Sequence, residues 1–305
     1  MKFAILGAGA VAGYFGARLD AAGEDVTHIA RGAHLEAIRS SGLRVESANG
    51  DLHIDPAKAT DDPAEIGPVD YVIFAVKLFD TEASGAMAKP LLGPGTTVVT
   101  LQNGVESVEV LSGILGAEHV MGGTAYISSV IAEPGLIRQT GTFATMVFGE
   151  ADGGRSERGE KLETACRGAG FDVEFSEAIE TRIWMKFLIL VVMSGITSVT
   201  RKPVGELRHD PDIRRLYENA IAEAGEVGRR RGISLPEDAV AKQMAAVDNF
   251  PPEMVASMVH DLNGGKRLEL DWLSGAVCRL GREAGVATPV HDTLYAALKP
   301  YKDGT

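Results

Sequence analysis

The hydrophobic pattern of the first half of the chain alternates between short apolar runs and amphipathic segments. Buried strands of a parallel sheet are continuous apolar runs, and the segments between them repeat with the period of a helix. The pattern therefore predicts an α/β domain with a parallel sheet. Its strands are predicted at Lys2–Leu6, Asp25–Ala30, Tyr71–Val76 and Thr97–Leu101, with a helix from Val11 to about Ala22.

Other parts of this half follow an antiparallel pattern. Asn-Gly between two short apolar runs is a typical hairpin turn, and a second alternating region surrounds a Pro-Gly turn. The predicted strands are Leu43–Ser47, Leu52–Ile54, Thr124–Ile131, Leu136–Gln139 and Thr145–Gly149, with turns at Asn49-Gly50 and Glu133-Pro134-Gly135. The helix Arg155–Gly168 and the strand Asp172–Phe175 complete a domain that is predicted to span residues 1–176.

Only helical patterns follow Ser176, so residues 177–305 are predicted to form an all-helical domain. Its first helix includes Ile183–Met193, which is apolar on every face except at Lys186. A helix that is hydrophobic all round is normally buried, and this stretch is shorter than the roughly 20 residues of a membrane span. We expect a core helix, and apolar helical surface in this domain is compatible with a homodimer.

Lys186 is the first candidate for chemistry. Burial disfavours the charged ammonium and lowers its pKa, so this lysine can donate a proton near neutral pH. In the alternative interpretation, the side chain extends along its aliphatic stem to the surface and has no chemical role. The helix by itself does not distinguish the two interpretations.

Composition and charge narrow the classes of function. The chain has 305 residues and a net charge of -12, without a basic block, which argues against a nucleic-acid partner. Cys166 and Cys278 lie far apart without CxxC spacing, so we predict neither a disulfide framework nor a metal site. The start of the chain fits a strand, turn and helix rather than a signal peptide, so we expect a cytoplasmic protein without a membrane partner.

A glycine-rich segment follows the first strand directly. It fits G-x-G-x-x-G/A between a strand and a helix, the context in which this motif binds a dinucleotide. The first glycine allows a tight turn, the second lets backbone N–H groups approach a pyrophosphate, and the last small residue permits close helix–strand contact. The predicted cofactor-binding residues are Gly7, Ala8, Gly9, Ala10, Val11 and Ala12.

The end of the second strand indicates which nucleotide is bound. NAD-binding folds usually place Asp or Glu there to hold the ribose hydroxyls, but this chain has Ala30-Arg31-Gly32. The Arg31 guanidinium can pair with a 2′-phosphate in a bidentate manner, which favours NADP(H). Alternatively, Arg31 is an ordinary surface residue at the start of the next helix.

Two further strand ends carry polar residues. Lys77 follows the strand that begins at Tyr71, and Asn103 follows the strand that begins at Thr97. Ligands of doubly wound sheets bind beyond the carboxyl ends of the strands, so Lys77 and Asn103 are placed to contact the cofactor or the substrate. Each could instead cap the helix that follows it.

The last helical region contains Ser257 and Glu269. On one unbroken helix these residues would lie about 120° apart. Gly264 and Gly265 permit a break, so Ser257 can end one helix while Glu269 opens the next. A glutamate in the first turn of a helix also complements the helix dipole, which is the structural alternative for Glu269.

Together these motifs resemble those of the ketopantoate reductases, in the same order over nearly the whole chain. The resemblance implies a Rossmann-type dinucleotide-binding domain and an all-helical domain like the C-terminal domain of 6-phosphogluconate dehydrogenase, with the active site between them. It rests on the glycine motif and on Arg31-Gly32, Val76-Lys77, Gln102-Asn103-Gly104, Trp184-Met185-Lys186, Gly205-Glu206-Leu207, Ser257–Asp261, Glu269-Leu270-Asp271 and Gly285–Pro289.

The activity that the resemblance implies is NADPH-dependent reduction of the 2-oxo acid 2-dehydropantoate (ketopantoate) to pantoate, in pantothenate biosynthesis. By position, Lys186 would be the general acid, and Glu269 would hold the hydroxyl side of the substrate and the surroundings of Lys186. Ser257 would bind the substrate carboxylate. Asn103 would orient the lysine, the substrate or the nicotinamide, and Lys77 and Arg31 would serve the cofactor.

The chain departs from the family where asparagines usually line the substrate pocket. These positions, four and eight residues after the lysine and three before the serine, hold Leu190, Ser194 and Met254. We therefore expect Leu190 and Ser194 to line a more apolar substrate pocket. Three hypotheses remain: reduction of ketopantoate, reduction of a more apolar 2-oxo acid or ketone, and a redox sensor that binds NADP(H) without turnover. The joint presence of Lys186 and Glu269 argues against the sensor.

Overall fold

The computed structural model describes residues 1–304, and its internal contacts divide the chain into two units, Met1–Arg182 and Ile183–Thr305. The division cuts the helix α6 (Ile179–Thr200), whereas the predicted boundary precedes this helix. The difference has a local cause. Arg182 in the first turns of α6 donates a 2.7 Å hydrogen bond to Glu174, so this part of the helix remains attached to the first unit.

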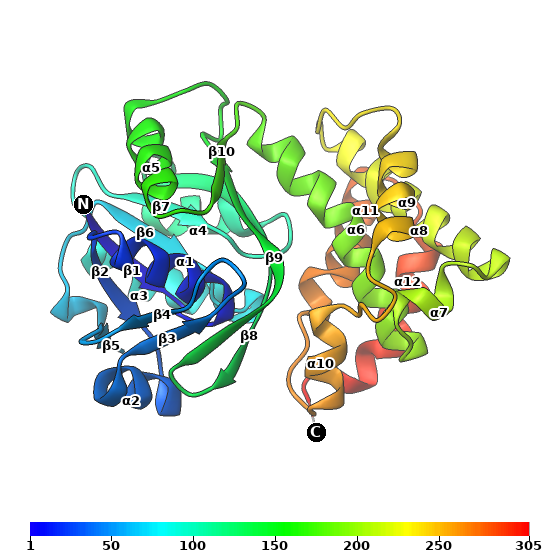
Figure 1. Cartoon of the computed structure of the whole chain (residues 1–305). Helices are drawn as coiled ribbons and strands as arrows, with labels where there is room; N and C mark the ends of the chain where they lie inside the picture. Colours follow the sequence, from blue (N-terminus) through cyan, green and yellow to red (C-terminus); the bar gives the residue numbers. More distant parts are fainter. Residues whose placement is uncertain (305) are drawn as a thin grey trace. The chain divides into compact units, whose positions relative to one another are not determined.

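The first unit is built on a ten-stranded mixed sheet with the order β4-β3-β9-β8-β7-β6-β1-β2-β5, and β10 pairs with β9 (Figure 1). The strands are β1 Lys2–Leu6, β2 Asp25–Ile29, β3 Leu43–Glu46, β4 Leu52–Ile54, β5 Lys58–Thr60, β6 Tyr71–Phe74, β7 Thr97–Thr100, β8 Val120–Glu133, β9 Leu136–Gly149 and β10 Asp172–Phe175. The predicted parallel strands and the antiparallel hairpin β3–β4 are confirmed.

The register of the central strands aligns their carboxyl ends. In the parallel pairs of β1, Leu6 is opposite Ile29 of β2 and Phe74 of β6. All four residues of β6 are buried, as expected for a strand covered on both faces. The loops that follow these strands therefore begin at one edge of the sheet, where ligands of such folds bind.

The antiparallel region differs from its prediction in one respect. β9 is a single strand, whereas two separate runs, Leu136–Gln139 and Thr145–Gly149, were expected. Its pairing with β8 contains register shifts. Across the irregular stretch, the Gln139 side chain donates a 2.9 Å hydrogen bond to the carbonyl of Phe143. This bond connects the two runs without the alternating pattern of a regular strand.

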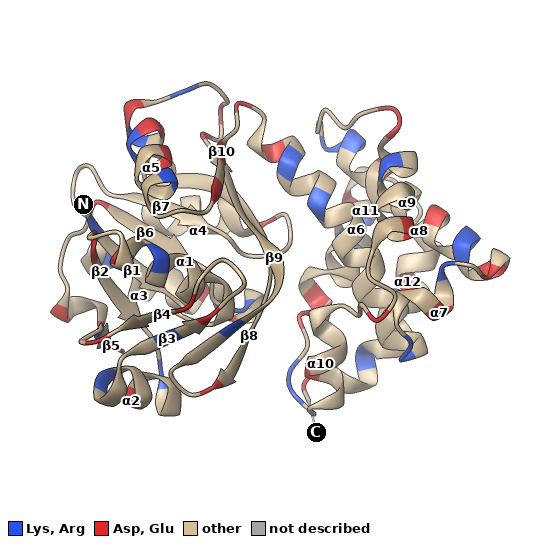
Figure 2. Ribbon diagram, in the orientation of Figure 1, with Lys and Arg blue, Asp and Glu red and all other residues tan. Residues whose placement is uncertain are grey.

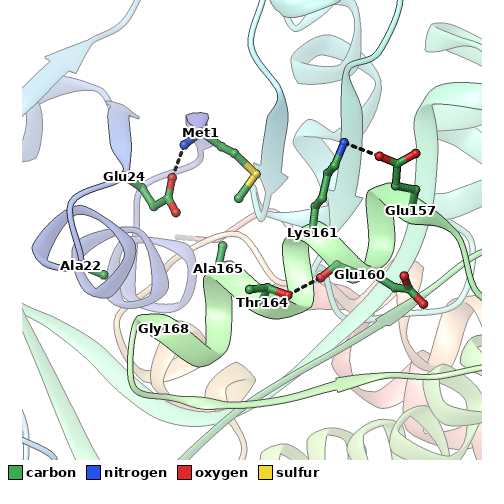
Figure 3. Close-up of a pocket in the computed structure, with 9 residues that line it drawn as sticks. All are labelled: Met1, Ala22, Glu24, Glu157, Glu160, Lys161, Thr164, Ala165 and Gly168. Carbon is green, nitrogen blue, oxygen red and sulfur yellow. Dashed lines mark hydrogen bonds and ion pairs between the residues drawn. The ribbon is translucent and has the colours of Figure 1, made fainter.

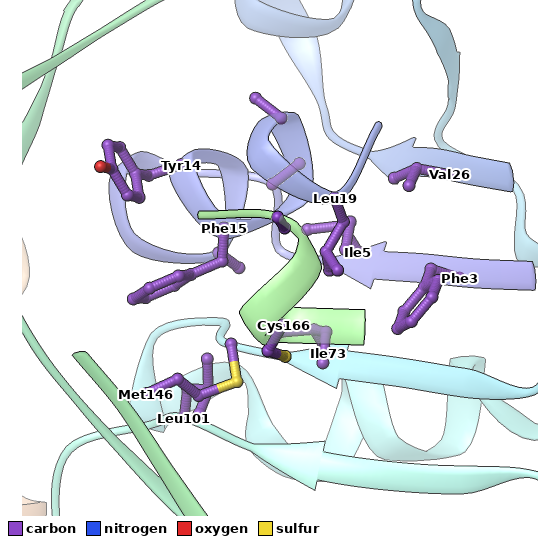
Figure 4. Packing of buried hydrophobic residues seen from close by; sticks show 14 of the residues in the cluster. Phe3, Ile5, Tyr14, Phe15, Leu19, Val26, Ile73, Leu101, Met146 and Cys166 are labelled. Atoms are coloured by element: carbon purple, nitrogen blue, oxygen red, sulfur yellow. The ribbon is translucent and has the colours of Figure 1, made fainter. Parts of the chain in front are cut away.

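Helices cover both faces of the sheet, and an aromatic and aliphatic core lies beneath α1. Figure 4 shows Phe15 and Leu19 of α1 packed toward Ile5 of β1 and the neighbouring strands. A Cβ on Gly16 would lie only 2.7 Å from Ile5, so glycine permits this close approach. The helices are α1 Ala10–Ala21, α2 Gly32–Ser41, α3 Thr81–Met87, α4 Ser107–Leu115 and α5 Glu157–Gly168, with 3-10 turns η1 Pro63–Glu65, η2 Leu78–Asp80, η3 Lys89–Leu91 and η4 Ala117–His119.

The second unit is helical throughout its described residues, as predicted. Besides most of α6 it contains α7 Val204–Leu207, α8 Pro211–Arg230, α9 Ala239–Asn249, α10 Ser257–Asn263, α11 Ser274–Ala284 and α12 Pro289–Leu298, with 3-10 turns η5 Leu270–Trp272 and η6 Lys299–Tyr301. The charged positions of α6 lie toward its N-terminal end (Figure 2). By length and composition α6 could cross a membrane, but 61% of its most apolar window is buried inside the protein, as in a core helix.

One helix boundary in this unit was predicted wrongly. Ser257 begins α10 and does not end a helix, and Glu269 immediately precedes the 3-10 turn η5. The reason is the Pro251-Pro252 pair, because proline cannot continue a helix and disfavours helical backbone in the residue before it. α9 therefore ends at Asn249, and a new helix starts after the loop.

Candidate active site

The glycine-rich loop makes a tight turn at the end of β1. The backbone N–H groups of Gly7 and Ala8 donate to the carbonyl of Ile29, at 3.2 and 3.0 Å. Gly7 has a φ of +83°, and a Cβ there would lie 2.9 Å from Val76. Both the backbone angle and the lack of space require glycine at this position.

The start of α1 can hold an anion. Its N-cap is Gly9, no side chain caps it, and its first turn has no acidic residue. The first N–H groups of a helix have no partner within the helix and attract negative charge. A Cβ at Gly9 would have no heavy atom nearer than 3.9 Å, so a ligand can approach the backbone. These features fit the pyrophosphate of a dinucleotide.

His34 on α2 supports this loop, although the sequence motifs did not indicate it. The N–H of Gly135, in the β8–β9 turn, donates to Nδ1 of His34 at 3.0 Å. Nε2 of the same ring is 3.0 Å from the carbonyl of Ala8. A backbone N–H can only donate, so Nδ1 is the acceptor and Nε2 carries the proton. The neutral imidazole therefore links the glycine-rich loop to the hairpin.

Replacement of His34 is expected to weaken nucleotide binding. His34→Ala removes both bonds and should raise the Kd for the dinucleotide, measured with NADPH and with NADH, by about five- to thirtyfold, at roughly 1 kcal/mol per hydrogen bond. His34→Gln should restore most of the affinity, because an amide supplies one acceptor and one donor. Fluorescence titration measures the Kd, and a glutamine variant as weak as the alanine variant would contradict this role.

The same contacts predict a pH dependence. Burial lowers the pKa of His34 below its usual 6.5, so the folded protein favours the neutral ring. The contribution of His34 is present above about pH 6.5 and is lost as the pH falls through the lowered pKa, because protonated Nδ1 cannot accept from Gly135. The affinity for the dinucleotide should fall in acid for the wild type and should change less for His34→Gln.

Arg31 follows β2 and is the N-cap residue of α2. Its side chain is 67% exposed and donates a 3.2 Å hydrogen bond to Asp80, the last residue of η2. The sequence pattern did not reveal this partner because 49 residues separate the two positions. Asp80 places a carboxylate beside Arg31, although the end of β2 itself has none.

Lys77 and Asn103 follow β6 and β7, the strands predicted to carry them. Lys77 is exposed and is the N-cap residue of η2, and Asn103 is half-buried. Gln102 joins the two strand ends, because its amide donates to the carbonyl of Val76 at 3.0 Å and to the hydroxyl of Thr81 at 2.8 Å. Gln102 is buried and fixes the backbone next to Asn103, a role that no sequence pattern indicated.

In the second unit, Lys186 lies on the half-buried side of α6. Burial lowers the pKa of its ammonium to about 8. Leu190, one turn further along, is also half-buried, whereas Trp184 and Phe187 are buried in the core. The carbonyl of Met185 accepts a 2.9 Å hydrogen bond from the Gln243 side chain of α9, which fixes the helix next to the lysine.

Ser194 follows Lys186 by two turns of α6. It is 1% exposed, and its hydroxyl has no hydrogen-bond partner among the described residues. Most buried polar groups in proteins are hydrogen-bonded, so an unpartnered hydroxyl is available to a ligand or to water. Met254, at the third position where the family usually has asparagine, is half-buried in the loop before α10.

Ser257 and Glu269 have different environments. Ser257 is exposed in the first turn of α10, and the preceding N–H of Ala256 contacts the Thr197 hydroxyl of α6 at 3.4 Å. Glu269 is 8% exposed. Beside it, Asp271 accepts hydrogen bonds from Tyr295 at 2.8 Å and Lys302 at 3.1 Å. These bonds connect the turn η5, which directly follows Glu269, to α12 and to the segment after η6.

A separate hollow of about 460 Å³ lies in the first unit between the start of β1 and α5 (Figure 3). Its charged groups are already paired, since Lys161 binds Glu157 at 2.7 Å and the Met1 amino group binds Glu24. The hollow is at the amino end of β1, opposite the glycine-rich loop. Ligands of parallel sheets bind at the carboxyl ends, so this hollow is not the candidate site.

Comparison with known proteins agrees with both units. Residues 3–153 match the family described as ketopantoate reductase PanE/ApbA, and residues 178–302 match its C-terminal domain. The chain is 32% identical over 320 residues to a 2-dehydropantoate 2-reductase of Mesorhizobium japonicum, covering 98% of this chain and 97% of the relative.

Two solved structures show the same fold. A PanE/ApbA family ketopantoate reductase from Ralstonia eutropha is 31% identical, with a TM-score of 0.91 over 99% of this chain and 98% of that chain. A D-mandelate dehydrogenase with NADH and anilino(oxo)acetate also has a TM-score of 0.91, over 99% of this chain and 98% of that chain, but is only 23% identical and supports the fold alone. The chain therefore belongs to the ketopantoate reductase PanE/ApbA family of NAD(P)-dependent oxidoreductases that act on CH-OH groups.

Proposed function

We propose that the protein reduces the carbonyl of a 2-oxo acid with NADPH, and that ketopantoate, reduced to pantoate, is the first candidate substrate. The observation that carries this proposal is the lysine on an apolar helix. Burial lowers the pKa of Lys186 to about 8, which makes its ammonium a better acid than a solvated lysine. A proton donor is what carbonyl reduction requires in addition to a hydride source.

The residues of the second unit suggest how the substrate is bound and protonated. The Lys186 ammonium would hydrogen-bond the carbonyl oxygen, stabilise the developing alkoxide and transfer a proton from Nζ to that oxygen. Ser257 would donate its exposed hydroxyl to the carboxylate. Glu269 would accept from the substrate hydroxyl and help to position Lys186. When bound, NADPH supplies the hydride.

The residues of the first unit support a dinucleotide. The uncapped start of α1 suits the pyrophosphate, and Arg31 favours NADPH because its guanidinium can bind a 2′-phosphate in a bidentate manner. Lys77 supplies a further positive charge for the phosphates, and Asn103 offers an amide to the nicotinamide or the substrate.

A second candidate is a reductase of a more apolar 2-oxo acid. Leu190 and Met254, both half-buried, stand where the family usually has asparagine, and neither can hydrogen-bond a substrate hydroxyl. A site without such a partner binds a hydroxylated acid less well. The fold itself does not decide the substrate, because the D-mandelate dehydrogenase shares it.

The experiment follows NADPH oxidation at 340 nm with ketopantoate and a panel of bulkier, more apolar 2-oxo acids. Fast oxidation with ketopantoate supports the first candidate. Oxidation with the other acids alone supports the second. No oxidation by a protein that still binds NADPH would favour a redox sensor and contradict both reductase proposals.

Leu190→Asn tests whether the pocket has lost affinity for ketopantoate. We expect kcat/KM for ketopantoate to rise about three- to tenfold, because the amide restores one hydrogen bond to the substrate. Val199→Asn is the control, since Val199 is 43% exposed on the same helix and should leave kcat/KM unchanged. High wild-type activity together with no gain from Leu190→Asn would contradict the idea of a changed pocket.

A further inference from the structure

The Arg31–Asp80 ion pair connects the segments that follow two non-adjacent strands. Arg31 follows β2, and Asp80 ends the turn η2 after β6. β1 lies between β2 and β6 in the sheet, and its carboxyl end continues into the glycine-rich loop. The Arg31 guanidinium and the Asp80 carboxylate, 3.2 Å apart, therefore meet over the strand that carries the loop.

The position of this ion pair is one at which dinucleotide folds distinguish NAD(H) from NADP(H). At the end of the second strand of a dinucleotide fold, a carboxylate holds the ribose 2′-hydroxyl of NAD(H), and an arginine accommodates the 2′-phosphate of NADP(H). This protein has both groups, each contributed by a different segment. A carboxylate beside Arg31 repels a 2′-phosphate and competes with it for the guanidinium.

We infer that Asp80 sets the nucleotide preference of this protein by opposing the 2′-phosphate of NADP(H) and accepting the 2′-hydroxyl of NAD(H). The pair is suited to this exchange, because the Arg31 side chain is 67% exposed and that of Asp80 is 36% exposed. An exposed ion pair is weak, so a ligand phosphate can take over the guanidinium. The inference rests on the proposed binding of NADP(H). It implies that the protein discriminates only moderately between NADPH and NADH.

The test is Asp80→Asn, which removes the charge and keeps the shape of the side chain. Titration of nucleotide fluorescence gives the Kd for NADPH and for NADH without turnover. We expect NADPH to bind about three- to tenfold more tightly, from the loss of repulsion and of competition for Arg31. NADH should bind no more tightly than to the wild type. The ratio of the two Kd values is therefore the decisive quantity.

Glu82→Gln is the matched control, because Glu82 is an exposed acid in the first turn of α3. Its substitution changes the net charge of the protein as much as Asp80→Asn does. It should leave the ratio unchanged. The inference is overturned if Asp80→Asn changes the Kd values for NADPH and NADH by the same factor or leaves both unchanged. It is also overturned if the variant binds NADPH more weakly, as expected if the carboxylate only orients Arg31. A wild type that binds neither nucleotide would instead overturn the proposed function.

Discussion

Lys186→Ala is expected to lower kcat for 2-oxo acid reduction by about 10²–10⁴-fold, the usual effect of removing a general acid. The variant also loses the cation that, in the proposed reaction, stabilises the developing alkoxide. NADPH affinity should remain, because the proposed nucleotide-binding residues belong to the first unit. Lys186→Arg should restore the charge but little of the rate, since a guanidinium keeps its proton up to a pH above about 12.

The pH profile gives an independent test of the same lysine. With a pKa of about 8, Lys186 is protonated below pH 8 and loses its proton above it. The value of kcat/KM for reduction should therefore be flat below pH 8 and fall about tenfold per pH unit above it. Lys202→Ala, at an exposed position that pairs with Glu206, is the control. Unchanged kcat in Lys186→Ala would exclude the lysine from the mechanism.

The features predicted best from sequence are those in which neighbouring residues determine the structure. β1, the glycine turn and α1 follow one another directly, and the positive φ at Gly7 is the reason for a glycine there. The apolar composition of α6 likewise predicts its burial. In each case the pattern that predicts the feature lies within about 20 residues of the chain.

Features that depend on distant segments were not predicted. His34 meets Gly135 only because the β8–β9 hairpin folds back over the start of α2, and Asp80 meets Arg31 only because η2 follows a strand two places away in the sheet. The helix boundary at Ser257 was predicted wrongly for a local reason, because Pro251-Pro252 follow the end of α9 and a new helix begins only at Ser257.

Arg31→Ala should raise the Kd for NADPH by about 10–100-fold, because a hydrogen bond to a charged group contributes roughly 1.5–3 kcal/mol. The Kd for NADH should change less than about threefold, since NADH has no 2′-phosphate and Asp80 still offers a carboxylate to its ribose. Fluorescence titration with the two nucleotides measures both values, and raising the salt concentration should weaken NADPH binding more in the wild type than in the variant.

The specificity of this effect distinguishes recognition from general electrostatics. Arg39→Ala removes an exposed arginine that pairs with Asp61 and lies on α2, the helix that Arg31 precedes. It therefore reproduces the change in charge away from the end of β2. If Arg31→Ala and Arg39→Ala weaken NADPH binding equally, the change in net charge explains the result. If Arg31→Ala weakens the binding of NADPH and NADH equally, the arginine supports the fold of the loop and does not bind the 2′-phosphate. Only a loss confined to NADPH and to Arg31 places the 2′-phosphate at this guanidinium.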